Sequence, residues 1–90
     1  MNTITWEEAQ RASGYYCAVR DLEEELEEEL RDKGDFDSQY TEHPDWYDKS
    51  DQLADKWALT PREDEVLSYA LDAGLCDYFG PEDVMEVLQS

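Results

Sequence analysis

Apolar side chains recur along this chain every three or four residues, which is the spacing of one face of an α-helix. The clearest series is made of three leucines that lie four residues apart, Leu22, Leu26 and Leu30. Upstream, Thr5 and Glu8 have the spacing of a capping box, in which each side chain bonds to the backbone amide of the other residue. Downstream, Gly34 is the glycine that often follows a helix. The pattern predicts one long helix over Thr5–Lys33.

Gly14 is the weak point of this predicted helix, because a glycine in a helix interior costs about 1 kcal/mol relative to alanine. A pause at Ser13 and Gly14 is therefore an alternative to one continuous helix. We expect the helix to continue, because Tyr15, Ala18 and Val19 extend its apolar face into the leucine series.

A second helix is predicted over Pro44–Leu59. One of its faces carries four side chains at helical intervals, Trp46, Ser50, Leu53 and Trp57. Pro44 suits the first turn, where the missing amide hydrogen is not needed. Because two tryptophans on one face can bury much surface, we expect this helix to lie at the centre of the core.

Two shorter helices complete the predicted fold. Thr60 and Glu63 form a second capping box, which starts a helix over Pro61–Ala73. A last helix is predicted over Pro81–Leu88, and residues 34–43 have turn-forming residues without a helical period.

These elements define an all-α fold class: one small domain over residues 1–90, with four or five helices and a long acidic first helix. A chain of this length can bury only a modest core. We expect the helices to pack through five side chains, Trp46, Leu53, Trp57, Val66 and Leu71.

The charge of the chain changes this picture. It has 25 aspartates and glutamates against seven lysines and arginines, which gives a formal net charge of −18. Such a charge repels nucleic acid and anionic membranes and attracts basic proteins. It also destabilises the compact state, so we expect salt to stabilise the fold and stability to fall as pH rises through the carboxylate range.

Six of the carboxylates lie within seven residues, Glu23, Glu24, Glu25, Glu27, Glu28 and Glu29, with Leu26 among them. Seven helical residues rise about 10 Å, and duplex DNA carries about six negative charges over that length. The run therefore has the linear charge density of a DNA duplex.

A solvated or disordered face is the common alternative for such a run. Two features of the run argue against it. Its glutamates repel one another at a spacing of four residues with no basic side chain between them, and they lie near the negative end of the helix dipole. A second row of carboxylates, Asp45, Asp48, Asp51 and Asp55, lies along the second predicted helix. Asp32 extends the first run.

The sequence has few residues in the patterns that catalytic or metal-binding sites need. The single histidine, His43, lies in a loop, where we expect a helix-cap or surface role. Asp35 and Asp37 begin like a calcium loop, but Tyr40 and Trp46 stand where that loop needs glycine and glutamate. No short pair of cysteines or histidines indicates zinc. We expect no catalytic residue, no cofactor and no metal, and hence a protein that is not an enzyme.

Cys17 and Cys76 are most simply reduced core residues, although spacing alone does not exclude a disulfide. The first residues, Met1 to Thr5, lack the basic and apolar regions of a signal peptide, and no apolar run is long enough to cross a membrane. We therefore expect a cytoplasmic protein.

In charge, size and helix content, the chain resembles the DNA-mimic inhibitors of phages, which include anti-restriction and anti-CRISPR proteins. The resemblance implies that the acidic surface occupies the basic DNA channel of a host defence nuclease, inside the host cell, without binding nucleic acid or membranes itself. The partner-binding residues would be the carboxylates of both rows, Glu23, Glu24, Glu25, Glu27, Glu28, Glu29, Asp32, Asp45, Asp48, Asp51 and Asp55.

An acidic adaptor, an antitoxin or a chaperone-like module is the alternative. Such a protein would shield a basic partner without imitating DNA. A mimic competes with DNA for one site on its partner, whereas an adaptor binds while DNA stays bound. The oligomeric state is open at this point.

Overall fold

The structure, a computed structural model, describes residues 3–76 and 78–89. It contains four α-helices and one short 3₁₀ helix, which are α1 (Trp6–Asp32), η1 (Tyr40–Glu42), α2 (Trp46–Trp57), α3 (Pro61–Asp72) and α4 (Pro81–Gln89). The described residues include no strand. The predicted all-α fold class and its four helices are therefore confirmed, with every boundary within two residues of the observed one.

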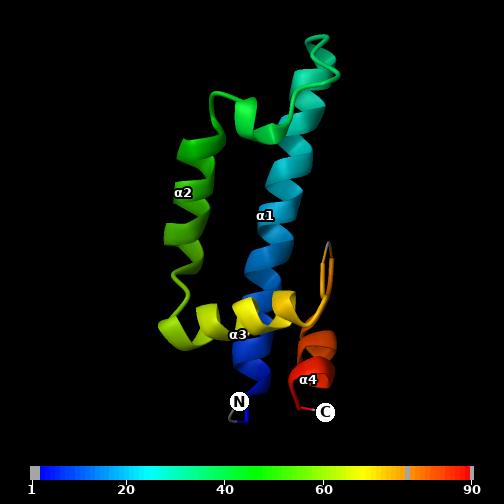
Figure 1. The fold of residues 1–90 in the computed structure, drawn as a ribbon. Coiled ribbons are helices and arrows are strands. Elements are labelled where there is room, and N and C mark those ends of the chain that lie inside the picture. The colour runs from blue at the N-terminus through cyan, green and yellow to red at the C-terminus, as the bar shows by residue number, and fades with distance from the viewer. Residues whose placement is uncertain (1–2, 77, 90) are drawn as a thin grey trace.

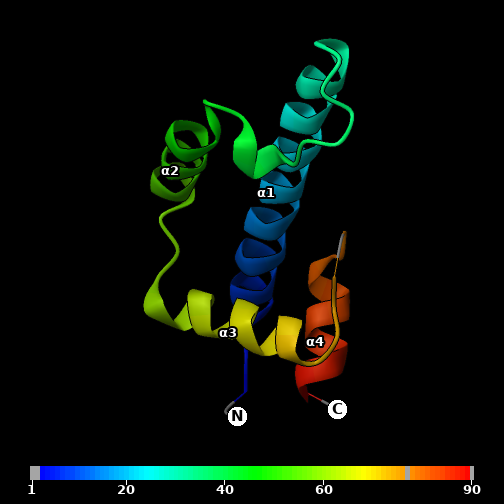
Figure 2. The ribbon, with the colours of Figure 1, turned by 45° about the horizontal axis from the view of Figure 1, so that its top comes forward.

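The long helix α1 is the element on which all the others pack. The chain rises along α1, returns beside its upper half as α2, and crosses its lower half as α3 (Figure 1). The last helix, α4, lies beside the lower half of α1, and the start of α1 and the end of α4 both lie at this lower end (Figures 1 and 2). The molecule is elongated, with extents of 47 × 24 × 16 Å.

Helix α1 runs through Gly14 without a break, as predicted. Its capping box is formed, because the Glu8 amide donates to the Thr5 hydroxyl at 3.1 Å and the Thr5 amide donates to Glu8 Oε1 at 2.9 Å. Gly14 lies against the ring of Trp57, and a Cβ at this position would come within 2.6 Å of the ring. The glycine is therefore a contact residue between α1 and the end of α2.

The core lies at the lower end of the molecule, between α1, α3 and α4. Its buried apolar members are Ile4, Ala9, Ala12, Val66, Leu67, Ala70, Phe79 and Val84. Three of these members, Ala9 and Ala12 of α1 and Ala70 of α3, are small side chains that are fully buried.

The predicted packing is confirmed in part. Val66 is buried, and Trp57 lies against Gly14 of α1. Leu71 is 38% exposed, and no residue of α2 is buried, so the prediction that the second helix lies at the centre of the core is wrong. The helical period identified the face of α2 that contacts α1. It could not show that α2 lies beside the narrow upper half of the molecule, where a helix is covered on one side only.

Candidate functional site: the acidic face of the first helix

The glutamates of the acidic run lie in the upper half of α1. The apolar side of this part of the helix packs against the rest of the molecule. Leu26 and Leu30 are buried, so the apolar stripe beneath the run is covered. Gly34, with φ of 93°, ends the helix, and the Asp35 amide donates to the Leu30 carbonyl oxygen at 2.9 Å. The run therefore lies on a packed helix rather than on a free tail.

The six glutamates differ in what surrounds them. Glu24, Glu25, Glu28 and Glu29 are exposed, whereas Glu23 and Glu27 are partly buried. The Glu23 side chain is only 12% exposed and pairs with Arg20 at 2.8 Å. Glu29 lies 3.4 Å from Nε2 of His43. Glu23 and Glu29 thus have partners within the molecule, and Glu24 lies close enough to Tyr78 to raise its pKa.

Five exposed carboxylates follow a single line along α1. This acidic strip consists of Asp21, Glu24, Glu25, Glu28 and Asp32. Asp21 and Asp32 are about 16 Å apart along the helix axis. The strip thus presents one charge per about 3–4 Å, which is close to the spacing of about 3.4 Å per phosphate in one DNA strand rather than about 1.7 Å in the duplex.

Asp21 is a member of the strip that the sequence-based prediction missed. Its spacing from Glu24, Glu28 and Asp32, at three, seven and eleven residues, is the signal that could have identified it. Asp21 accepts a hydrogen bond of 2.7 Å from the hydroxyl of Tyr78. This bond, together with burial and the charges of Asp21 and Glu24, raises the pKa of Tyr78.

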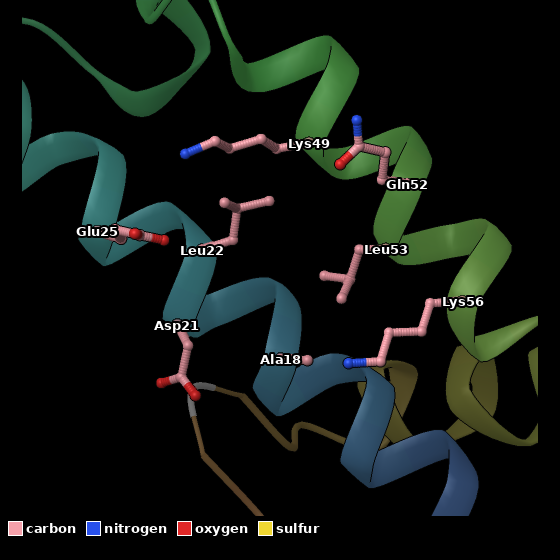
Figure 3. Close-up of a pocket in the computed structure, with 8 residues that line it drawn as sticks. All are labelled: Ala18, Asp21, Leu22, Glu25, Lys49, Gln52, Leu53 and Lys56. Carbon is pink, nitrogen blue, oxygen red and sulfur yellow. The ribbon is translucent and has the colours of Figure 1, made fainter.

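The second row of carboxylates does not join the strip. Asp45, Asp48, Asp51 and Asp55 are all exposed. By helical position, the last three lie on the face of α2 opposite Leu53, which points toward α1 (Figure 3). The structure therefore separates the two rows into two acidic surfaces.

A cleft of about 380 Å³ lies between α1 and α2, and we call it the α1–α2 cleft. Its lining residues are Ala18, Asp21, Leu22, Glu25, Lys49, Gln52, Leu53 and Lys56. Leu22 and Leu53 point toward each other across it, and the two lysines extend from α2 toward α1 (Figure 3). The acidic strip thus borders a cleft with an apolar floor and a basic wall.

The arginines of the lower half have partners there. Arg11 pairs with Glu63 at 2.9 Å, and Arg62 pairs with Glu8 at 3.2 Å. Hydrogen bonding from Thr5 outweighs burial and, with Arg62, lowers the pKa of Glu8. Burial acts to raise the pKa of Glu63, but hydrogen bonds from Thr60 and Arg11 outweigh it and lower the pKa. Residues 21–32, in contrast, have eight carboxylates and one arginine.

His43 is buried, so the predicted surface role is wrong, and the predicted helix-cap role is not shown, because the start of α2 has no side-chain cap hydrogen bond among the described residues. Its Nδ1 accepts a hydrogen bond of 3.0 Å from the amide of Asp45, the residue before α2. Its Nε2 is buried and lies 3.4 Å from a carboxylate oxygen of Glu29, with no hydrogen-bond partner among the described residues.

Cys17 is a partly buried free thiol, which donates to the Phe79 carbonyl oxygen at 3.4 Å. Cys76 is exposed, so the prediction that both cysteines lie in the core is wrong for Cys76. It follows the end of α3 in a segment that runs along the surface, and sequence spacing could not show this. Within residues 3–76 and 78–89, no three acidic, histidine or cysteine side chains gather as a metal ion would need.

In the same part of the chain, no helix has both the length and the apolar composition needed to cross a membrane. Comparisons with protein-family models, with curated proteins and with solved structures find no match to this chain. The site must therefore be interpreted from its own geometry.

Proposed function

We propose that the protein is a DNA mimic, which binds the basic nucleic-acid channel of a host defence nuclease or a similar machine and blocks the entry of DNA. The observation that carries this proposal is the acidic strip on α1: five exposed carboxylates in a line, at about the phosphate spacing of one strand. The mechanism is competition for the channel, so the chain needs no catalytic group.

The packing of α1 supports the proposal. Leu26 and Leu30 hold the helix against the rest of the molecule, so its carboxylates are placed before binding. A preorganised row loses less conformational entropy on binding than a flexible acidic tail. The strip also lies in the upper half of the elongated molecule, where α2 and η1 lie beside α1 and the helices α3 and α4 do not (Figure 1).

The test compares two variants that change net charge equally. The strip variant is Glu24→Lys/Glu25→Lys/Glu28→Lys, and the control is Asp48→Lys/Asp51→Lys/Asp55→Lys on α2. Each variant has three substitutions, and each substitution replaces a negative charge with a positive one. Both variants therefore have a net charge of −12 instead of −18. All six positions are exposed, so both variants are expected to fold.

Each protein is used to capture partners from host lysate, and the captured partner is then titrated with labelled duplex DNA. We expect the unaltered chain and the α2 control to displace the DNA, with affinity that falls steeply with salt. The strip variant is expected to lose at least about tenfold in affinity. If the strip variant still displaces DNA, the glutamate run is a solvated face; if only the control fails, the binding surface is the row on α2.

An acidic adaptor, antitoxin or chaperone-like module is the second candidate. It is favoured by the exposed aromatic side chains of Phe36 and Tyr47, which are 74% and 72% exposed and suit a protein surface better than a phosphate-binding channel. Such a module would bind its partner without displacing DNA, so the same titration separates the two functions.

A further inference from the structure

The α1–α2 cleft divides the acidic strip into two parts. Asp21 and Glu25 line the cleft on its α1 side, whereas Glu24, Glu28 and Asp32 lie outside it. All five carboxylates are exposed. The two parts therefore belong to one line of charge but have different neighbours.

The neighbours of the first part are the two lysines of α2. Lys49 and Lys56 line the same cleft as Asp21 and Glu25, and their side chains extend from α2 toward α1 (Figure 3). The lysines are about 10 Å apart along α2, and the two carboxylate residues are about 6 Å apart along α1. The flexible four-carbon stem of a lysine can close this difference. The cleft thus places two positive charges opposite two negative ones.

The surroundings strengthen the attraction between these charges. Ala18, Leu22 and Leu53 form an apolar floor between the two sides, and opposite charges attract more strongly beside such a surface than in bulk water. No residue of α2 is buried, so tight packing does not hold the lysine side chains in place. Among residues 3–76 and 78–89, neither lysine is held by another ion pair. Both lysines can therefore turn toward the carboxylates of α1.

We propose that Lys49 and Lys56 are internal counter-ions of Asp21 and Glu25, which close across the cleft and compete with a basic partner for these two carboxylates. The consequence for binding rests on the proposed function. A partner must displace the lysines before it can pair with the cleft side of the strip. The two lysines therefore lower the affinity of the strip and direct the partner to the carboxylates outside the cleft, Glu24, Glu28 and Asp32.

A double-mutant cycle on the chain alone tests the counter-ion contact. It uses Glu25, because Asp21 also accepts a hydrogen bond from Tyr78. Thermal midpoints are measured at low salt for the unaltered chain, Lys49→Gln, Glu25→Gln and the double variant. Lys49→Gln should lower the midpoint by about 2–4 °C more in the presence of Glu25 than in its absence, as an ion pair of this kind would.

Glu24→Gln is the matched control for this cycle. Glu24 is the adjacent residue and is also exposed, but it lies outside the cleft. Its cycle with Lys49→Gln should show no coupling beyond the error of the measurement. Absence of coupling between Lys49 and Glu25, or equal coupling of Lys49 to both glutamates, overturns the proposal.

Displacement of labelled DNA from the captured partner tests the competition. Lys49→Gln/Lys56→Gln should bind the partner at least about threefold more tightly than the unaltered chain, whereas Lys49→Arg/Lys56→Arg, which keeps both charges, should not. Arg31→Gln/Lys33→Gln also changes the net charge from −18 to −20, at exposed positions outside the cleft, and should gain less.

The two experiments separate failure of this inference from failure of the proposed function. If no form of the chain displaces DNA, the mimic function is wrong, and the cycle alone decides whether the lysines are counter-ions. If the unaltered chain displaces DNA but Lys49→Gln/Lys56→Gln gains no more than Arg31→Gln/Lys33→Gln, the lysines do not compete with the partner and the inference is overturned.

Discussion

Gly14 and Trp57 are in direct contact, and the contact explains why a glycine occupies the middle of a 27-residue helix. The ring lies over the helix backbone at the point where a Cβ would come within 2.6 Å. The Tyr15 ring packs edge-on against the Trp57 ring, with 6.4 Å between the two ring centroids. The Arg11 guanidinium carbon lies 5.9 Å from the centroid of the Trp57 ring. Arg11 also donates to the Trp57 carbonyl oxygen. These contacts fix the lower end of α2 against α1.

The first prediction follows from this contact. Gly14→Ala should destabilise the protein by about 1–3 kcal/mol, because overpacking against the ring outweighs the gain in helix propensity of about 1 kcal/mol. In a Trp57→Ala background, the same substitution should stabilise the protein by up to about 1 kcal/mol. Urea unfolding of the unaltered chain, the two single variants and the double variant measures both effects. If Gly14→Ala changes the free energy of unfolding in the same direction in both backgrounds, the contact is disproved.

The second prediction concerns Glu63. Its pKa in the folded state lies below the ordinary value of 4.5, so its charge stabilises the fold above that pH and the contribution is lost as pH falls through the folded-state pKa. Glu63→Gln retains the capping geometry and removes the charge opposite Arg11. We expect a loss of about 1 kcal/mol at neutral pH. The difference between the two proteins should shrink below pH 4.5, and urea unfolding across this range checks it.

This dependence has the opposite sign to the one expected from crowding of the carboxylates. Among the residues that the structure describes, Glu8 and Glu63 are the carboxylates whose pKa clearly departs from its usual value; both pKa values are lowered, and both side chains lie beside arginines. They therefore stabilise the fold as pH rises from the acid range. Composition could show that carboxylates are in excess, but not which of them have a cationic partner.

The third prediction concerns salt. Because residues 21–32 have eight carboxylates and one arginine, screening should relieve their repulsion. The thermal midpoint at neutral pH should rise with sodium chloride, by about 4–8 °C for each kcal/mol of relieved repulsion. Melts followed by circular dichroism test this. A midpoint that stays level would mean that the exposed carboxylates are too widely spaced to destabilise the fold.

The fourth prediction concerns the support of the acidic strip. Leu26 is fully buried beneath it, so Leu26→Ala should cost about 2–5 kcal/mol. Glu25→Ala, the neighbouring change on the exposed side, should alter stability by no more than about 0.5 kcal/mol. Urea unfolding provides both values. Similar losses at the two positions would show that the upper half of α1 is not packed through its leucines.

Local signals in the sequence predicted the helices well. The capping boxes at Thr5 and Thr60 and the glycine at Gly34 act within a few residues, so their effect does not depend on the rest of the fold. The position of the core depended on how the helices cross. Alanines such as Ala9, Ala12 and Ala70 carry little weight in a hydrophobic pattern, yet all three are fully buried members of the core.

Only part of the candidate site was predicted, because local spacing along a helix shows which side chains share a face but not which side chains of other elements they meet. Helical spacing placed Glu24, Glu25 and Glu28 on an exposed face, and the structure agrees. It could not reveal the Arg20 partner of Glu23 or the His43 side chain beside Glu29, because rotamers and loop paths decide those contacts. Separating the row on α2 from the strip also required the orientation of α2.

The start of α1 and the end of α4 both lie at the end of the molecule opposite to the upper half of α1 (Figure 1). A tag, a fluorophore or a fusion partner at either terminus would therefore stay clear of the acidic strip. Immobilised through a terminus, the protein would present Glu24, Glu28 and Asp32 to the solution. Either terminus is thus a suitable attachment point for the binding and competition measurements.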